Sequence, residues 1–276
     1  MSGMLYLVPT PIGNLGDISQ RCRETLEQAD FIAAEDTRVS LKLLNHLNIK
    51  KPLVSYYEHN REISGQKILD RILAGETCAL VSDAGSPAIS DPGEDLVALC
   101  AKHDITVSAI PGPCAVITAL SISGLPTGRF TFEGFLSTNK KSRQEHLEQL
   151  HSETRTMIFY EAPHKLTNTL SDLAAVFGPD RRISLCRELT KLHEEVIRTT
   201  LQGAQELYAE QSPRGEYVLV LEGAAPMQAE QITVDDALEL VKQKLSEGLS
   251  KKDAVKEIAR QTGIAKNMLY DAAMKL

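Results

Sequence analysis

The chain has 276 residues, of which 42% are hydrophobic, and this length accommodates two compact domains with their own cores. No run of 18 apolar residues occurs and the N-terminus lacks the pattern of a secretory signal, so we expect neither a membrane-spanning helix nor export. The net charge of −7 argues against a protein that coats nucleic acid electrostatically.

The five cysteines are scattered and form no Cys-x-x-Cys pair. This usage predicts thiols in a reducing cytoplasm and argues against a disulfide framework or a zinc site. The histidines do not show metal-ligand spacing either, so we expect no metal.

Apolar runs and helical patterns alternate in the first part of the chain. The runs at 4–9, 31–35, 53–55, 77–82 and 106–110 alternate with helical patterns at 19–30, 37–48, 62–75 and 91–103. This alternation predicts an α/β domain, placed at 1–112, with a mostly parallel sheet and helices on its faces.

Three loops rich in small residues follow strands of this predicted domain, at 9–17, 82–93 and 111–115. Ligands of open α/β sheets bind at the carboxyl ends of the strands, and Gly and Ser allow a close approach to the backbone. Asp83 offers a carboxylate to ribose hydroxyls or to an amine. The alternative is that each loop is an ordinary turn, since Gly, Pro, Ser and Asp favour turns for local reasons.

The pattern changes after the Pro-Gly-Pro segment at 111–113. A short apolar helix is expected at 116–122, and strands are expected at 130–135, 156–160, 183–187, 195–200 and 216–222, with only two long helices, at 140–151 and 163–177. This arrangement predicts a second domain, placed at 113–225, with a mixed sheet. Crevices between domains commonly hold ligands.

The last part of the chain, 226–276, is predicted to be a linker followed by a small helical module. Helices are expected at 234–246, 250–261 and 266–275, with Ser250 as a cap and Thr262-Gly263 as the turn of a helix-turn-helix. Residues 231–276 hold 8 Lys/Arg against 7 Asp/Glu, whereas the rest of the chain is acidic. The module is interpreted either as a nucleic-acid contact or as a cap that packs on the body or on a second subunit; the candidate contacts are Lys251, Lys252, Lys266 and Lys275.

Several motifs occur in a fixed order between residues 4 and 223. They lie at 8–17, 34–38, 81–87, 110–115, 160–164, 187–191 and 214–216. In these motifs the chain resembles the bacterial ribosomal RNA small subunit methyltransferase I family of the tetrapyrrole methylase superfamily. The resemblance implies a two-domain, S-adenosylmethionine-dependent enzyme that methylates the ribose 2′-hydroxyl of one cytidine in the decoding region of 16S rRNA, within the 30S subunit. It also implies a homodimer.

The resemblance further implies which residues bind S-adenosylmethionine, in a cleft between the domains. They are Pro9, Asp83, Ser86, Ile89, Cys114 and Ala115 from the first loops, and Tyr160, Leu189 and Gly215 from the second domain. The chain departs from the superfamily in its first loop, which has prolines in place of a Gly-Pro-Gly-Asp pattern. This departure argues against a porphyrin-type substrate, and the absence of a G-x-G-x-x-G motif argues against a conventional dinucleotide fold.

Glu35, Asp36 and Arg38 are the candidate catalytic residues, because they follow a predicted strand beside the cleft. One of the acids would orient or deprotonate the hydroxyl, and Arg38 would hold a phosphate. The alternative for Asp36 is an N-cap of the helix that starts near Thr37.

Two further groups are candidate RNA contacts. Asn60 and Arg61 follow Tyr56-Tyr57, whose rings are candidates for stacking on a flipped base, although such tyrosines are more often half-buried at a strand end. Lys140, Lys141 and Arg143 form a basic stretch that either grips phosphates or starts a solvated helix.

Two rival functions remain at this point. In the first, the chain has the same fold but methylates a tetrapyrrole precursor or another small molecule. In the second, it is a non-catalytic nucleic-acid-binding protein that uses its helix-turn-helix. The small-residue loops argue against the second rival, because such a protein does not need them.

Overall fold

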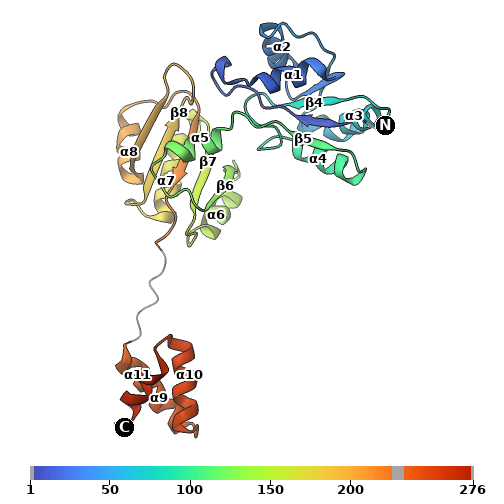
Figure 1. Cartoon of the computed structure of the whole chain (residues 1–276). Coiled ribbons are helices and arrows are strands. Elements are labelled where there is room, and N and C mark those ends of the chain that lie inside the picture. Colours follow the sequence, from blue (N-terminus) through green and yellow to red (C-terminus); the bar gives the residue numbers. More distant parts are fainter. Residues whose placement is uncertain (1–2, 226–232, 275–276) are drawn as a thin grey trace. The chain divides into compact units, whose positions relative to one another are not determined.

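The computed structural model describes residues 3–225 and 233–274 and divides the chain into two compact units, Met1–Ala224 and Ala225–Leu276. Two sheets with their helices form the first unit, and three helices belong to the second (Figure 1). The predicted linker at 226–232 and the candidate contact Lys275 lie outside the described residues.

The first sheet has five parallel strands in the order β3-β2-β4-β1-β5, as the alternating pattern predicted. The strands are β1 (Leu5–Leu7), β2 (Phe31–Ala34), β3 (Leu53–Ser55), β4 (Cys78–Val81) and β5 (Val107–Ala109). The connecting helices are α1 (Gln20–Gln28), α2 (Thr37–His46), α3 (Arg61–Leu73) and α4 (Gly93–Lys102), with short 3₁₀ turns η1 (Leu15–Asp17) and η2 (Glu58–Asn60).

Both faces of this sheet are buried. Phe31 and Ala33 contribute to the core on one face of β2, while Ile32 and Ala34 contribute to the core on the other. Successive side chains of a strand point to opposite faces, so an uninterrupted apolar strand requires helices on both sides.

The second sheet is mixed, as predicted. Its order is β6-β7-β10-β8-β9, with β6 parallel to β7 and the other neighbours antiparallel. The strands are β6 (Phe130–Phe135), β7 (Thr156–Glu161), β8 (Arg182–Arg187), β9 (Glu195–Thr200) and β10 (Tyr217–Leu221). The helices are α5 (Ala115–Ile122), α6 (Lys140–Gln149), α7 (Leu166–Phe177) and α8 (Leu201–Glu210), with the 3₁₀ turn η3 (Pro163–Lys165).

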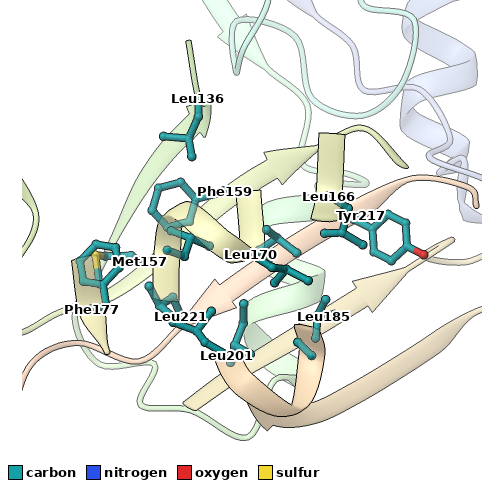
Figure 2. Close-up of a cluster of buried hydrophobic side chains, with 14 of the residues drawn as sticks. Leu136, Met157, Phe159, Leu166, Leu170, Phe177, Leu185, Leu201, Tyr217 and Leu221 are labelled. Atoms are coloured by element: carbon teal, nitrogen blue, oxygen red, sulfur yellow. The ribbon is translucent and has the colours of Figure 1, made fainter. Parts of the chain in front are cut away.

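Strand β10 lies in the centre of this sheet, between β7 and β8. Met157 and Phe159 of β7 share a buried cluster with Leu170 of α7 and Leu201 of α8 (Figure 2). On the opposite face, Ile158 packs with residues of α5. Residues of β10 belong to both of these clusters, so this central strand contributes to the cores on both faces of the second sheet.

The prediction of only two long helices in this part of the chain was wrong, because α8 is a third one. The Thr200 side chain caps it by accepting a hydrogen bond from the Gly203 nitrogen, and Leu201, Ala204 and Tyr208 form its buried face. Gly203 in the first turn lowers helix propensity, which obscures this pattern in the sequence.

The second unit contains α9 (Val234–Ser246), α10 (Lys251–Thr262) and α11 (Lys266–Ala273) around a small core of its own. Ser250 caps α10 as predicted, by accepting a hydrogen bond from the Asp253 nitrogen. Gly263 ends α10 with φ of 72°, in the left-handed region that favours glycine, which confirms the predicted turn.

None of the helices described over 3–225 and 233–274 has the length and apolarity needed to cross a membrane. The position predicted for the boundary between the first two domains, 112/113, falls between the last strand of the first sheet and the first helix on the second.

Candidate functional site

A cavity of about 400 Å³ lies in the first unit, where loops of the first sheet meet strands of the second. The first sheet contributes Glu35 at the end of β2 and residues 82–86 and 89–91, which follow β4. The second sheet contributes Tyr160 and Glu161 at the end of β7, and Val218 of β10. The size of this cavity lies within the range of small-molecule and cofactor sites.

The loop after β4 has a fixed shape. Asp91 Oδ1 accepts hydrogen bonds from the backbone nitrogens of Ala88 (2.9 Å) and Gly93 (2.8 Å). Gly85 has φ of 88°, which a residue with a side chain rarely adopts. Ser86 Oγ donates to the Pro113 carbonyl at 3.0 Å and so ties this loop to the loop after β5.

The N-terminal loop, residues 9–17, contacts the loop after β4 from another side. The backbones of Thr10 and Gly85 exchange two hydrogen bonds of 3.0 Å, and Thr10 Oγ1 donates to the Ser82 carbonyl at 3.1 Å. Ile12 of this loop packs in a cluster with Leu189 of the second sheet region. The loops that form this wall of the cavity are therefore held together by hydrogen bonds of both their backbones and their side chains.

The cavity brings together most of the residues predicted to bind the cofactor. Those that line it are Asp83, Ser86, Ile89, Cys114, Ala115, Tyr160 and Leu189. Pro9 is buried against Gly112 and is not part of the lining. Gly215, with φ of 82°, lies beside Glu188, and its neighbour Glu216 lines the cavity in its place.

Sequence reasoning missed several lining residues, among them Ile12, Phe135, Cys186 and Val218. Phe135 ends β6, while Cys186 and Val218 are paired across β8 and β10. The alternation of strand residues indicates which of them share a face, but only the three-dimensional structure shows that this face meets the loops of the first sheet. The sequence therefore predicts which strand residues lie on one face of the sheet, but it does not predict that this face borders the cavity.

The two neighbouring acids at the end of β2 have opposite environments. Burial, and then the charges of Asp83 and Asp91, raise the pKa of Glu35 above its usual value. Asp36 instead bonds to the Arg38 guanidinium, with Arg38 Nη2 at 2.6 Å from Asp36 Oδ2, and this contact lowers the pKa of Asp36 to about 2. Glu35 lines the cavity, whereas Asp36 and Arg38 do not.

Asp36 is the N-cap of α2, because its Oδ1 accepts a hydrogen bond of 2.8 Å from the Arg38 nitrogen. The capping alternative is therefore confirmed. The Asp36 nitrogen in turn donates to Asp83 Oδ1 at 3.0 Å, which fixes the Asp83 carboxylate at the edge of the cavity.

The suggestion that Tyr56 stacks on a base was wrong. Its ring is buried in the core of the first sheet, and its hydroxyl donates to the Pro92 carbonyl at 3.2 Å. Asn60 uses its side chain within its own turn, accepting from the Tyr57 nitrogen and donating to the Ser55 carbonyl. Arg61 is partly exposed and pairs with Asp95 at 2.7 Å.

The basic stretch at the start of α6 divides into two kinds of residue. Lys140 and Lys141 are exposed, as an RNA contact requires. Arg143, by contrast, has only 12% of its side chain exposed and bonds to Asp172 (2.5 Å) and Thr169 (2.8 Å) of α7. Its guanidinium joins two helices and is not presented at the surface, contrary to the expectation of a phosphate contact.

The candidate lysines of the second unit also differ in whether they are exposed or bonded within the protein. Lys251 Nζ donates to the Ala273 carbonyl at 3.0 Å and so connects the start of α10 to the end of α11. Lys252 and Lys266 are exposed. Among the residues described in both units, no group of three or more His, Cys, Asp or Glu side chains has the arrangement of a metal site.

A comparison with protein families matches residues 4–205 to the family Tetrapyrrole (Corrin/Porphyrin) Methylases and residues 232–276 to the RsmI C-terminal HTH domain. Solved structures agree on the fold. The methyltransferase CobJ superposes with a TM-score of 0.61 at 19% identity, covering 81% of this chain and 95% of that one. Uroporphyrin-III C-methyl transferase from Thermus thermophilus, complexed with S-adenyl homocysteine, superposes with a TM-score of 0.56 at 17% identity, covering 80% and 97%. Fold and family match thus define a methyltransferase of the tetrapyrrole methylase class.

Relatives with much higher sequence identity indicate a narrower family within this class. The protein named Ribosomal RNA small subunit methyltransferase I is 47% identical in Synechocystis sp., over 99% of this chain and 98% of the relative. The proteins of that name in Halalkalibacterium halodurans and Bacillus subtilis are 46% and 44% identical, each over 98% of this chain and 94% of the relative. The chain belongs to the ribosomal RNA small subunit methyltransferase I family.

Proposed function

We propose that the chain transfers a methyl group from S-adenosylmethionine to the ribose 2′-oxygen of a cytidine in the decoding region of 16S rRNA. The observation that carries this proposal is the position of Glu35, a carboxylate with a raised pKa, in the lining of a cofactor-sized cavity. The close relatives named as small subunit rRNA methyltransferases support the choice of acceptor.

The lining of the cavity fits S-adenosylmethionine chemically. The lining contains the carboxylates of Glu35, Asp83, Asp91, Glu161 and Glu216, and such a lining suits a ligand that carries a sulfonium and an ammonium group. Apolar contacts come from Ile89, Leu189 and other lining side chains. When bound, the cofactor supplies an activated methyl group, so the protein mainly has to hold the acceptor oxygen in line with it.

Glu35 is the proposed general base. The 2′-hydroxyl is a weak acid, and a carboxylate whose pKa lies above its usual value accepts its proton more readily than an ordinary one. Asp36 is a poor base because its pKa is lowered to about 2, so its proposed role is to position Arg38 and α2. Proton transfer to Glu35 would accompany formation of the bond from the 2′-oxygen to the methyl carbon, while the bond from that carbon to the sulfonium sulfur breaks and S-adenosylhomocysteine leaves.

The proposed substrate is the assembled 30S subunit in the cytoplasm, and the proposed working form is a homodimer. Exposed Lys140, Lys141, Lys252 and Lys266 are the proposed phosphate contacts. A local basic surface is sufficient for this role even in a chain whose net charge is −7.

The decisive experiment incubates the purified protein with tritiated S-adenosylmethionine and 30S subunits that lack their native methylations. We expect label on a single cytidine, and resistance to alkaline cleavage on its 3′ side, because a 2′-O-methyl group blocks that cleavage. Absence of label, together with calorimetric binding of the cofactor, would favour a small-molecule acceptor instead.

A further inference from the structure

A second cavity, of about 240 Å³, shares the 82–83 segment with the cofactor cavity. Apart from Ser82 and Asp83, it is lined by the N-terminal loop and by α2, and none of these other residues lines the first cavity. The two cavities are therefore separate spaces that meet at one short segment.

The walls of this second cavity are mainly apolar. Leu15 of the N-terminal loop is 48% exposed and Val39 of α2 is 38% exposed, and Leu43 lies one turn further along α2. Apolar side chains on two sides of a small space suit the two faces of a single heterocyclic base. The space is much smaller than the cofactor cavity, which argues against a tetrapyrrole in it.

A polar group in the lining of this cavity has no partner. Ser40 is only 4% exposed, and its hydroxyl makes no hydrogen bond within the described part of the chain. A buried hydroxyl without a partner is unfavourable, and a ligand with polar atoms on its edge would satisfy it. Lys42 and His46, one turn apart on the same helix, are exposed and supply donors for a phosphate.

The segment between the two cavities is rigid. Thr10 holds the Ser82 carbonyl and pairs with the Gly85 backbone, while Asp83 Oδ1 accepts from the Asp36 nitrogen. In a ribonucleoside, the carbon that bears the 2′-oxygen is bonded to the carbon that bears the base. A base in the second cavity therefore brings its own 2′-oxygen close to the segment that borders the first.

We infer that the second cavity receives the base of the acceptor nucleotide, turned out of the RNA stack, while the 2′-oxygen reaches the cofactor cavity beside Asp83. Enzymes that act on a nucleotide inside folded nucleic acid commonly extrude it into a pocket. This inference rests on the proposed function and adds the place where the acceptor is recognised.

The test fills the cavity without touching the cofactor site. Val39→Trp places a large ring in the second cavity from an exposed helix position, and Leu41→Trp is the matched control, because Leu41 is 49% exposed on the same helix and does not line the cavity. For Val39→Trp we expect kcat/KM for 30S methylation and the affinity for 30S without cofactor to fall at least about tenfold, the scale of one lost base contact. Calorimetry should give wild-type affinity for S-adenosylmethionine in both variants.

Ser40→Ala gives a second, independent readout. If the hydroxyl serves only the nucleotide, its removal should raise the melting temperature of the free protein and lower kcat/KM for 30S. A purely structural role predicts that both quantities fall together or that neither changes, and either result would overturn the role given to Ser40.

The outcomes distinguish failure of the base cavity from failure of the proposed function. If Val39→Trp methylates 30S as well as Leu41→Trp and the unaltered protein do, the base cavity is refuted and the proposed function stands. If the unaltered protein binds S-adenosylmethionine but methylates no 30S, the proposed function fails and the inference fails with it.

Discussion

Glu35 and Asp36 are adjacent acids whose surroundings give them different chemistry. One faces the cavity and is partly desolvated, and the other is neutralised by Arg38 at the start of α2. The sequence placed both residues beside the site but could not divide the roles between them. The raised pKa of Glu35 depends first on its burial and then on Asp83 and Asp91, which are distant in the chain.

Glu35→Gln should lower the rate of methyl transfer by about 10²- to 10⁴-fold, the usual contribution of a general base. In the unaltered protein the rate should fall on acidification as Glu35 becomes protonated, and at a higher pH than for an ordinary glutamate, because its pKa is raised. Single-turnover transfer to 30S, measured from about pH 5 to about pH 8, reports this acid limb.

Asp36→Asn is the control for this measurement. It keeps an N-cap oxygen for α2 but removes the charge that pairs with Arg38, so we expect a slightly lower melting temperature with the acid limb in place. An acid limb that persists in Glu35→Gln would assign the proton transfer to another group.

At the scale of elements, α6 and α7 are joined by Arg143. This residue bonds to Asp172 and Thr169, and the Thr169 hydroxyl also donates to the buried carboxylate of Glu161 in the cavity lining. A chain of contacts thus connects a helix pair on the surface to the end of β7.

Arg143→Ala should reduce the free energy of unfolding by about 1–3 kcal/mol, because it leaves partly buried acceptors without their donor. Affinity for 30S should change less than about twofold, in contrast to an RNA contact. Urea unfolding and filter binding measure the two quantities. Lys141→Ala, at an exposed position of the same helix, is the matched variant, and for it we expect unchanged stability and weaker 30S binding. If Arg143→Ala instead left the stability unchanged and weakened 30S binding, Arg143 would be an RNA contact after all.

Much of the fold was readable from local pattern. The alternation of apolar runs and helical stretches predicted the parallel sheet, and the small-residue loops predicted which strand ends face a ligand. Helix α8 was missed because Gly203 weakens its first turn, although Thr200, Leu201 and Tyr208 carry a cap and a helical face. The position of β10 between β7 and β8 is a long-range pairing, so the residues that it brings to the cavity were not readable from any single segment.

At the scale of the whole molecule, the two units have separate cores. The core of the second unit is built from its own three helices, including Val241 of α9, Ile258 of α10 and Leu269 of α11. All residues that line the cofactor cavity belong to the first unit. Truncation can therefore remove the second unit, with two of the proposed phosphate contacts, while the cavity stays complete.

A chain that ends at Ala224 should bind S-adenosylmethionine with wild-type affinity, because it keeps the complete cavity. Its kcat/KM for 30S should fall at least about tenfold, since the exposed Lys252 and Lys266 are lost. Calorimetry and tritium transfer measure the two effects. The dependence of 30S binding on salt should also weaken; an unchanged salt dependence would assign the second unit to contacts within the protein.

The burial of the thiols has a consequence for chemical reactivity. Cys22, Cys78, Cys100 and Cys186 are buried, and burial raises the pKa of Cys100 and of Cys186 to about 11. Cys114 and Cys186 both line the cofactor cavity, but only Cys114 is half-buried rather than buried. Alkylation requires an accessible thiolate, so iodoacetamide should modify Cys114 first. S-adenosylhomocysteine should slow that reaction, so Cys114 reports whether the cavity is occupied. Peptide mass spectrometry measures this labelling without any substitution. Equal labelling of a buried thiol would contradict this assignment.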